Sequence, residues 1–406
     1  MNSVPAVPMQ ARPAPLDSLS TTGRPQEIVL IGASLAHLEF MAQLRAKPLT
    51  QARVTLVSPD ARMLPVNRLA DILSGEAELA ACHIGLQDLA RACGVGWEHD
   101  KVTRLDLASQ RITLAGGRTL RFDWLSLSPR CWDDRKPLNT QMTGALDHGL
   151  FTHPLEHFLA LWPRVMDLNL RGNLRITVLA GGEAGAEIAF AIKHHFPQAS
   201  MTWVTGGATT EEQGPENGGL EAALKAADIT VLHDHAVGIS HGSVRLACGA
   251  SLVCDVPIVA DSLGPPQWLR DSGLLPQPEA DPAQAGSQPA VDTWSRCTGH
   301  PQVFLAEEAD NALGHNLAAS VHGTALRAAS SPRGNYWRGL FHNPGVLLQW
   351  EPMPLRGALL RWVRAAHVRK LLGRYQTGHA PPVLPNAAEM AEVVEPDETR
   401  QAHKAR

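Results

Sequence analysis

Two stretches of the chain share one pattern of apolar and polar positions. Residues 27–40 read EIVLIGASLAHLEF, and residues 175–188 read RITVLAGGEAGAEI. In each stretch a β-rich apolar run meets glycine and continues at once into an alanine-rich helical start. A strand that passes through a glycine turn into a helix is typical of a dinucleotide-binding βα unit. The repetition predicts two nucleotide-type domains in one chain.

The segments after each unit also correspond. A second strand is predicted at 52–58 in the first half and at 201–205 in the second half. Short alternating runs separated by turns then predict a β-meander in each half. These runs are 102–107, 111–114 and 120–127 in the first half, and 236–239, 243–247 and 251–259 in the second. The pattern therefore predicts an α/β protein with parallel sheets and two Rossmann-like three-layer domains.

Composition changes this picture little. The chain has 406 residues, 44% of them hydrophobic and 19% charged, with a formal net charge of -4. These values are typical of soluble globular proteins and give no sign of a nucleic-acid binder. The six cysteines form no C-x-x-C pair, so we predict reduced thiols in a cytoplasmic protein rather than a redox dithiol or zinc knuckle. Proline-rich residues 1–25 and residues 377–406 are predicted to be a flexible lead and tail.

The first glycine turn departs from the complete fingerprint at two positions. It reads Gly32-x-Ser34-x-x-His37, so the bend glycine is present. Ser34 stands where a second glycine usually lets the backbone approach a diphosphate. Its side chain could clash with the diphosphate, or its hydroxyl could donate to it. His37 takes the position at which the helix packs on the strand.

The second turn departs in the opposite way. It reads Ala180-x-Gly182-x-x-Gly185, with Glu187 just inside the helix. The close-approach glycine is present, and the bend glycine is alanine, with Gly181 as a source of flexibility. For either turn alone, a plain tight turn in an α/β core is an equally good interpretation.

The end of the second strand usually selects the nucleotide. An acidic residue there binds the ribose of NAD, and a nearby arginine favours NADP. Ser58 and Thr205 occupy these places, and Asp60 follows shortly after Ser58. The choice between NAD and NADP therefore stays open.

Longer motifs resemble a known family. The motifs are IGASLAHLE, VTLVSPDARMLP, GRTLRFDWLSL, VLAGGEAGAE, WVTGG, PPQWL and VDTWSRCTGHPQVF. In this order and spacing they resemble the FAD-dependent pyridine nucleotide–disulfide oxidoreductases. The similar branch is that of type II NADH dehydrogenase-like proteins, which are sometimes fused to selenide, water dikinase. The resemblance covers most of residues 27–375.

The resemblance implies a domain order and an activity. An FAD-type domain (26–145 and 286–330) would be interrupted by an NAD(P)H-type domain (146–285), followed by a C-terminal α+β segment (331–376). Hydride would pass from NAD(P)H through FAD to a quinone or another small-molecule acceptor. His153 would be a proton donor near the flavin. The implied cofactor contacts are Gly32, Ala33, Ser34, Ser58, Pro59, Arg62 and Glu308 for FAD, and Gly182, Gly185, Glu187 and Thr205 for NAD(P)H.

Several family motifs are altered in this chain. The family's A-T-G, G-D, V-K-P and D-x-G-S appear as Ala260-Asp261-Ser262, Glu307-Glu308, Thr152-His153-Pro154 and Ser128-Pro129-Arg130. Glu307 replaces a glycine that lies beside the flavin, and it adds bulk and charge. The alternative is therefore a non-catalytic nucleotide-binding or regulatory protein that has lost tight FAD binding on the scaffold of a flavoenzyme.

Two further stretches have competing interpretations. His233, His235 and His241 could ligate a metal, but exposed loop histidines are commoner, so we predict no metal site. Residues 355–375 carry six basic residues and no acid. They could form an amphipathic helix that lies at the inner face of an anionic membrane. Alternatively, such a helix packs its leucines on the body of the protein, which the irregular apolar stripe slightly favours.

Overall fold

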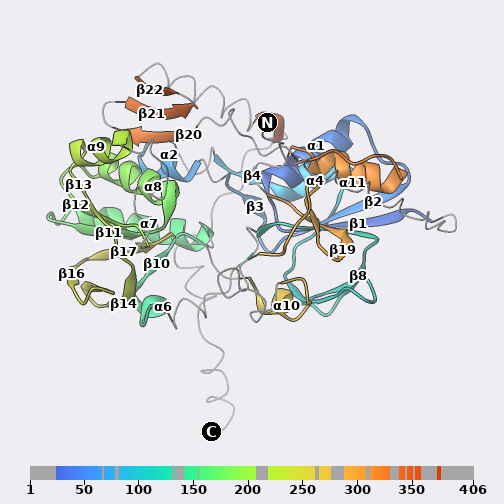
Figure 1. The fold of residues 1–406 in the computed structure, drawn as a ribbon, viewed down its shortest axis with the longest axis horizontal. Coiled ribbons are helices and arrows are strands. Elements are labelled where there is room, and N and C mark those ends of the chain that lie inside the picture. Colours follow the sequence, from blue (N-terminus) through green and yellow to red (C-terminus); the bar gives the residue numbers. More distant parts are fainter. Residues whose placement is uncertain are drawn as a thin grey trace, which may run out of the picture.

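The computed structural model describes two parallel sheets, which lie side by side with their covering helices (Figure 1). The described residues are 24–65, 68–77, 82–129, 132, 141–153, 155–206, 218–260, 265–275, 288–307, 311–329, 338–342, 345–350, 353–357 and 373–375.

The first sheet has the order β18-β19-β9-β1-β2-β5. Its strands are β1 (Gln26–Ile31), β2 (Ala52–Val57), β5 (Gly96–Glu98), β9 (Trp124–Leu127), β18 (Arg296–Cys297) and β19 (His300–Leu305). All neighbours are parallel except β18 and β19. One face packs on α1 (Leu35–Ala46), α4 (Leu86–Ala92) and α11 (Leu313–His322). The other face packs on an antiparallel meander of β6 (Val102–Asp106), β7 (Arg111–Leu114) and β8 (Thr119–Arg121).

The second sheet repeats this plan with the order β10-β17-β11-β12-β13, all parallel. Its strands are β10 (Leu150–Phe151), β11 (Arg175–Leu179), β12 (Ser200–Val204), β13 (Ile229–Leu232) and β17 (Val256–Val259). The helices in its core are α7 (Leu155–Asn169), α8 (Gly182–His195) and α9 (Gly218–Ala226). The meander on its other face is β14 (Ala236–Ser240), β15 (Ser243–Leu246) and β16 (Ser251–Val253).

The chain returns to the first sheet after it has built the second. Strands β18 and β19 follow the second sheet in sequence, yet β19 pairs with β9 of the first sheet. The predicted fold class is confirmed, with the second Rossmann-like unit inserted in the first. The apolar runs define both sheets because parallel strands covered on two faces need apolar residues throughout.

Two predicted strands were wrong in extent. Residues 120–127 and 251–259 each divide into a meander strand and a strand of the parallel sheet. An aspartate lies at each division. Asp123 accepts from the backbone N–H of Glu27 at 2.8 Å, and Asp255 accepts from the backbone N–H of Arg175 at 2.9 Å. Asp123 thus ties the change of sheet to the start of β1, and Asp255 ties it to the start of β11.

Five short elements lie outside the sheets, meanders and helices named above. They are β3 (Arg62–Met63), β4 (Ile84–Gly85), α2 (Leu69–Leu73), α6 (Ala145–His148) and α10 (Gln267–Arg270). Helix α2 comes from the first half of the chain but packs on α8 in the core of the second half. At the end of α2, a Cβ added to Gly75 would lie 2.5 Å from Nδ1 of His195, so the two helices are in close contact there.

The predicted helix at 355–375 is wrong at its first residues, whereas residues 373–375 are helical. Strands β20 (Arg338–His342), β21 (Gly345–Trp350) and β22 (Met353–Gly357) form an antiparallel sheet next to α8 (Figure 1). Residues 355–357 are therefore strand, because they pair with β21. Residues 358–372 lie outside the described part. At 374–375, Arg374 and the Tyr375 hydroxyl bind Glu39 of α1 at 3.0 and 2.8 Å, so this end packs on the body.

The helices that the structure describes include none with the length and apolar character needed to span a bilayer.

Candidate functional site

The first predicted site lies at the carboxyl edge of the first sheet. The N–H of Gly32 donates to the Val57 carbonyl at 2.8 Å, and the N–H of Ser128 donates to the Ile31 carbonyl at 2.9 Å. The turns after β1, β2 and β9 are therefore adjacent. This brings the predicted residues Gly32, Ala33, Ser34 and Ser58 together. Arg62 lies apart on β3, where it pairs with Gly85 of β4.

Ser34 caps its own helix instead of facing an open space. Gly32 has φ 78°, a left-handed conformation that favours glycine, so the bend is made as predicted. Ser34 is the N-cap of α1, and its Oγ accepts from the N–H of His37 at 3.2 Å. The residue is fully buried. One helix N–H that could face a diphosphate is therefore already bonded within the protein.

His37 fills the space between α1 and the sheet. Its Nδ1 lies 2.6 Å from the Gly32 carbonyl oxygen, and its Nε2 lies 2.8 Å from Oγ of Ser126 on β9. A carbonyl only accepts, so Nδ1 donates to Gly32 and Nε2 accepts from the Ser126 hydroxyl. Burial lowers the pKa of His37 to about 4, although the bond to Gly32 opposes this shift. The imidazole is therefore neutral near pH 7.

This buried imidazole makes stability depend on pH. The folded pKa of about 4 lies below the ordinary value of 6.5, so the unfolded chain binds more protons between these values. The contribution is complete above about pH 6.5 and is lost as the pH falls toward 4. The loss should reach about 3 kcal/mol in the free energy of unfolding. Denaturant unfolding across this range checks it against His37→Gln, which should lack this part of the slope. Equal slopes in both proteins would contradict the prediction.

Two further groups at this edge are also hydrogen-bonded within the protein. Oγ of Ser58 accepts from the N–H of Asp60 at 3.2 Å, and a ring nitrogen of His99 lies 2.9 Å from the Pro59 carbonyl oxygen. Glu307 is exposed, so it does not fill the edge. Glu308 lies outside the described residues. With Ser34 and His37 placed as they are, the first turn does not fit a diphosphate.

The second predicted site lies at the carboxyl edge of the second sheet. The N–H of Ala180 donates to the Val204 carbonyl at 3.2 Å, and the N–H of Thr205 donates to the Leu232 carbonyl at 3.0 Å. Helix α8 starts here, with Gly181 as N-cap and no side-chain cap. Gly181 has φ -73°, which any residue can adopt, so the turn does not use the flexibility predicted for it.

Gly185 lets α8 pack directly on the sheet. A Cβ added there would lie 2.4 Å from Nε1 of Trp203 and 2.9 Å from the Ala180 carbonyl oxygen. These two atoms form a hydrogen bond with each other, since Nε1 of the fully buried Trp203 donates to the Ala180 carbonyl oxygen at 2.9 Å. Gly185 therefore has the helix-packing role of the third glycine in a dinucleotide turn.

A cavity of about 480 Å³ adjoins this second turn. Its lining comprises Gln141, Met142, Leu179, Ala180, Val204, Gly206, His235, Ala236 and Val237. Gly206 has φ 74°, and a Cβ on it would lie 3.8 Å from Cα of Gly181, so this lining residue neighbours the N-cap of α8. A helix N-terminus without a side-chain cap, next to a cavity of this size, suits the phosphates of a dinucleotide. The residues at the second turn therefore fit such a cofactor.

The remaining predicted residues lie around this edge. Thr205 is fully buried at the end of β12, with Oγ1 3.5 Å from Nδ1 of His233, and Glu187 is half-buried within α8. His153 follows β10 of the second sheet, with Nδ1 3.3 Å from the Thr152 hydroxyl. Its role beside a flavin stays a prediction. Across the described residues, no three His, Cys, Asp or Glu side chains are grouped to hold a metal ion.

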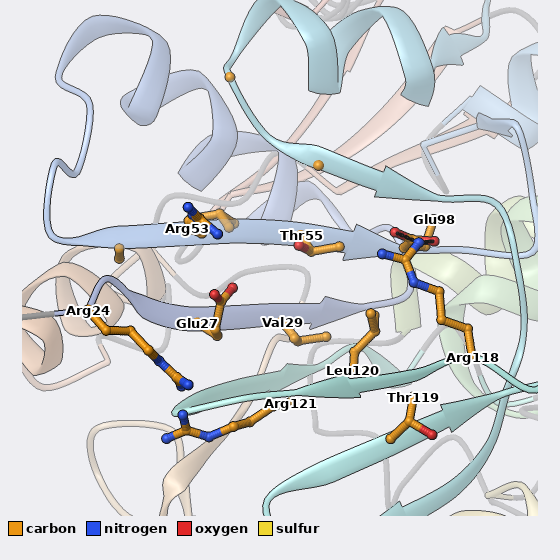
Figure 2. Close-up of a pocket in the computed structure, with 14 residues that line it drawn as sticks. Arg24, Glu27, Val29, Arg53, Thr55, Glu98, Arg118, Thr119, Leu120 and Arg121 are labelled. Carbon is orange, nitrogen blue, oxygen red and sulfur yellow. Dashed lines mark hydrogen bonds and ion pairs between the residues drawn. The ribbon is translucent and has the colours of Figure 1, made fainter. Parts of the chain in front are cut away.

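A charged cavity on the first sheet was not predicted. Its volume is about 580 Å³. Its lining residues lie on β1, β2 and β5 and on the facing strand β8 (Figure 2). At one end Arg118 contacts both carboxylate oxygens of Glu98 at 2.6 and 2.7 Å. Arg121 at the other end binds Asp123 at 2.6 Å. Its charges come from residues far apart in sequence, so no local motif pointed to it.

No protein-family model matches the chain, and no curated protein matches it either. Solved structures do match. The sulfide:quinone oxidoreductase of the hyperthermophilic bacterium Aquifex aeolicus has a TM-score of 0.69 at 14% identity, covering 91% of this chain and 95% of that one. The fold is that of two-domain flavoprotein reductases.

Two further matches were solved with a nicotinamide nucleotide. NDH2 from Plasmodium falciparum in complex with NADH has a TM-score of 0.63 at 12% identity, covering 88% of this chain and 99% of that one. The water-forming NADH oxidase from Lactobacillus brevis, bound to NADH, has a TM-score of 0.59 at 15% identity, covering 80% and 74%. At such identities the likeness concerns the fold alone.

Proposed function

We propose that this chain binds a pyridine nucleotide, NAD(H) or NADP(H), at the turn between β11 and α8. The observation that carries the proposal is the uncapped N-terminus of α8 beside the 480 Å³ cavity. The helix N–H groups and the helix dipole favour a negatively charged diphosphate at this place. Gly182 is the first residue of the helix, where a backbone without Cβ allows close approach.

The surroundings support the orientation of such a ligand. Thr205 and Gly206 follow β12, where the ribose of the adenosine lies in dinucleotide folds. Ala236 and His235 lie at the start of the meander and line the same cavity. Apolar walls with a few polar groups are typical of cofactor cavities. NDH2 and the NADH oxidase, which share the fold, were solved with NADH, and this adds a reason to test that nucleotide first.

Titration of the full-length protein with NADH and, separately, NADPH tests the proposal. Energy transfer from tryptophan to the reduced nicotinamide gives the binding signal, and the melting temperature gives a second one, since a ligand of the native state raises it. We expect saturable binding of at least one nucleotide. Millimolar concentrations of both nucleotides without either signal would exclude the proposal.

The second candidate is an FAD-dependent oxidoreductase that passes hydride from NAD(P)H to a quinone or another small acceptor. The shared reductase fold and the bend at Gly32 favour it. The buried Ser34 and His37 weigh against it, because they leave no fit for the flavin diphosphate. An absorption spectrum before and after addition of NADH separates the candidates, since a flavoenzyme would be yellow and would bleach.

The domain boundaries are also proposed. Residues 26–145 with 286–330 form the FAD-type domain, and 146–285 form the inserted NAD(P)H-type domain. The course of β19 supports this division, because it rejoins the first sheet after the second is complete.

A further inference from the structure

Three buried side chains join the first turn, the first helix and the neighbouring strand. Ser34, His37 and Ser126, here called the Ser34–His37–Ser126 cluster, are all fully buried. The His37 backbone donates to Ser34, and its ring bonds to the Gly32 carbonyl and to Ser126 at 2.6 and 2.8 Å. The cluster therefore ties α1 to β1 and β9 by bonds within the protein alone.

Two members of the cluster stand at the positions of the second and third glycine of a dinucleotide turn. In a dinucleotide turn the second glycine leaves a gap for the phosphates, and the third brings the helix close to the strand. Ser34 and His37 stand at these two positions. The side chain of Ser34 occupies the space that a glycine would leave for the phosphates. Its Oγ accepts a hydrogen bond from the N–H of His37 in the first turn of the helix. The imidazole of His37 fills the space between the helix and the sheet.

The second turn of the same chain provides a comparison. Its helix has no side-chain cap, and its third glycine has no room for a Cβ. A cavity adjoins it. Both turns connect a central parallel strand to a helix in the same kind of unit. The two turns differ in the side chains at these positions, and also in backbone, since only Gly32 has a positive φ and α8 starts one position earlier in the motif than α1.

We infer that the Ser34–His37–Ser126 cluster replaces the diphosphate of FAD, so that the first half of this protein is complete without a flavin. A nucleotide bound at the second turn is then held as a ligand and is not oxidised through a resident flavin. The replacement of the FAD diphosphate concerns the first turn, whereas the proposed nucleotide site lies at the second turn. The inference about FAD therefore does not depend on the proposed function.

Flavin content and FAD binding of the full-length protein test the inference. The purified protein is denatured to release any flavin, and a second sample is melted with added FAD and, in parallel, with NADH. We expect no released flavin and no change of melting temperature with FAD. Stoichiometric flavin, or a melting temperature that rises with FAD concentration, would overturn the inference. The NADH sample reports separately on the proposed function, so the two can fail independently.

Nitrogen-15 spectra of the histidine rings give a second readout. The cluster requires His37 to stay neutral, with the proton on Nδ1, across the pH range in which an imidazole in the unfolded chain becomes charged. Ser126→Ala removes the donor to Nε2 and should shift the Nε2 resonance of His37 alone. A His37 ring that titrates like an unfolded imidazole, or one that does not respond to Ser126→Ala, would contradict the arrangement.

Discussion

Gly185→Ala should lower the free energy of unfolding by about 3 kcal/mol, because its Cβ has no room. The Cβ would lie 2.4 Å from Nε1 of Trp203 and 2.9 Å from both the Cβ and the carbonyl oxygen of Ala180. Overpacking costs about 1–3 kcal/mol, and separating the indole from its buried carbonyl partner costs about 1–3 kcal/mol more. The better helix propensity of alanine returns about 1 kcal/mol.

Denaturant unfolding measures this loss, and Gly85→Ala is the matched control. Gly85 has φ -71°, and a Cβ there would meet only an Asp88 oxygen at 3.9 Å. Gly85 is also the N-cap of α4, where alanine is less favourable than glycine, so the control should lose only about 1 kcal/mol or less. If Gly185→Ala were as stable as Gly85→Ala, helix α8 would not pack on β11 and β12 as closely as described.

Gly182→Asp should weaken nucleotide binding by at least about tenfold, which corresponds to about 1.4 kcal/mol. Gly182 begins α8, so the new carboxylate would lie where the diphosphate is proposed to bind. An acidic residue in the first helical turn is favourable for the helix, so the fold should be kept. The measurement is the NADH titration, with circular dichroism to confirm folding.

Leu170→Asp serves as the control for charge. Leu170 is 84% exposed after α7, so the substitution adds the same charge to the second half of the chain without touching the cavity. It should bind NADH like the wild type. Equal affinity of folded Gly182→Asp and Leu170→Asp would place the nucleotide elsewhere.

Local sequence patterns were enough for most of the secondary structure. The β-rich runs that became β1, β2, β11 and β12 are short and followed by glycine or small residues, so they were found nearly to the residue. The bounds of the strands within 120–127 and 251–259 were not predicted correctly, because an apolar stretch does not show that the chain passes from one sheet to another within it. The aspartates that mark these changes bond to Glu27 and Arg175, which are distant in sequence.

The candidate sites show the same limit. Gly182 and Gly185 were assigned from spacing alone, and the structure places them at an uncapped helix start and at a close helix–strand contact. The two outcomes for Ser34, clash or donation, could not be separated from the sequence. The structure shows a third, in which the hydroxyl caps the helix that it precedes.

The sequence by itself determined that this protein has two strand–glycine–helix units, since periodicity and glycine act over a few neighbouring residues. Only the tertiary structure decided which of the two turns adjoins a cavity. His37 is held by Ser126, which lies 89 residues further along the chain, and α8 is held close by Trp203 on the next strand. Contacts of this kind depend on how strands pair in space, and no local pattern of residues specifies them.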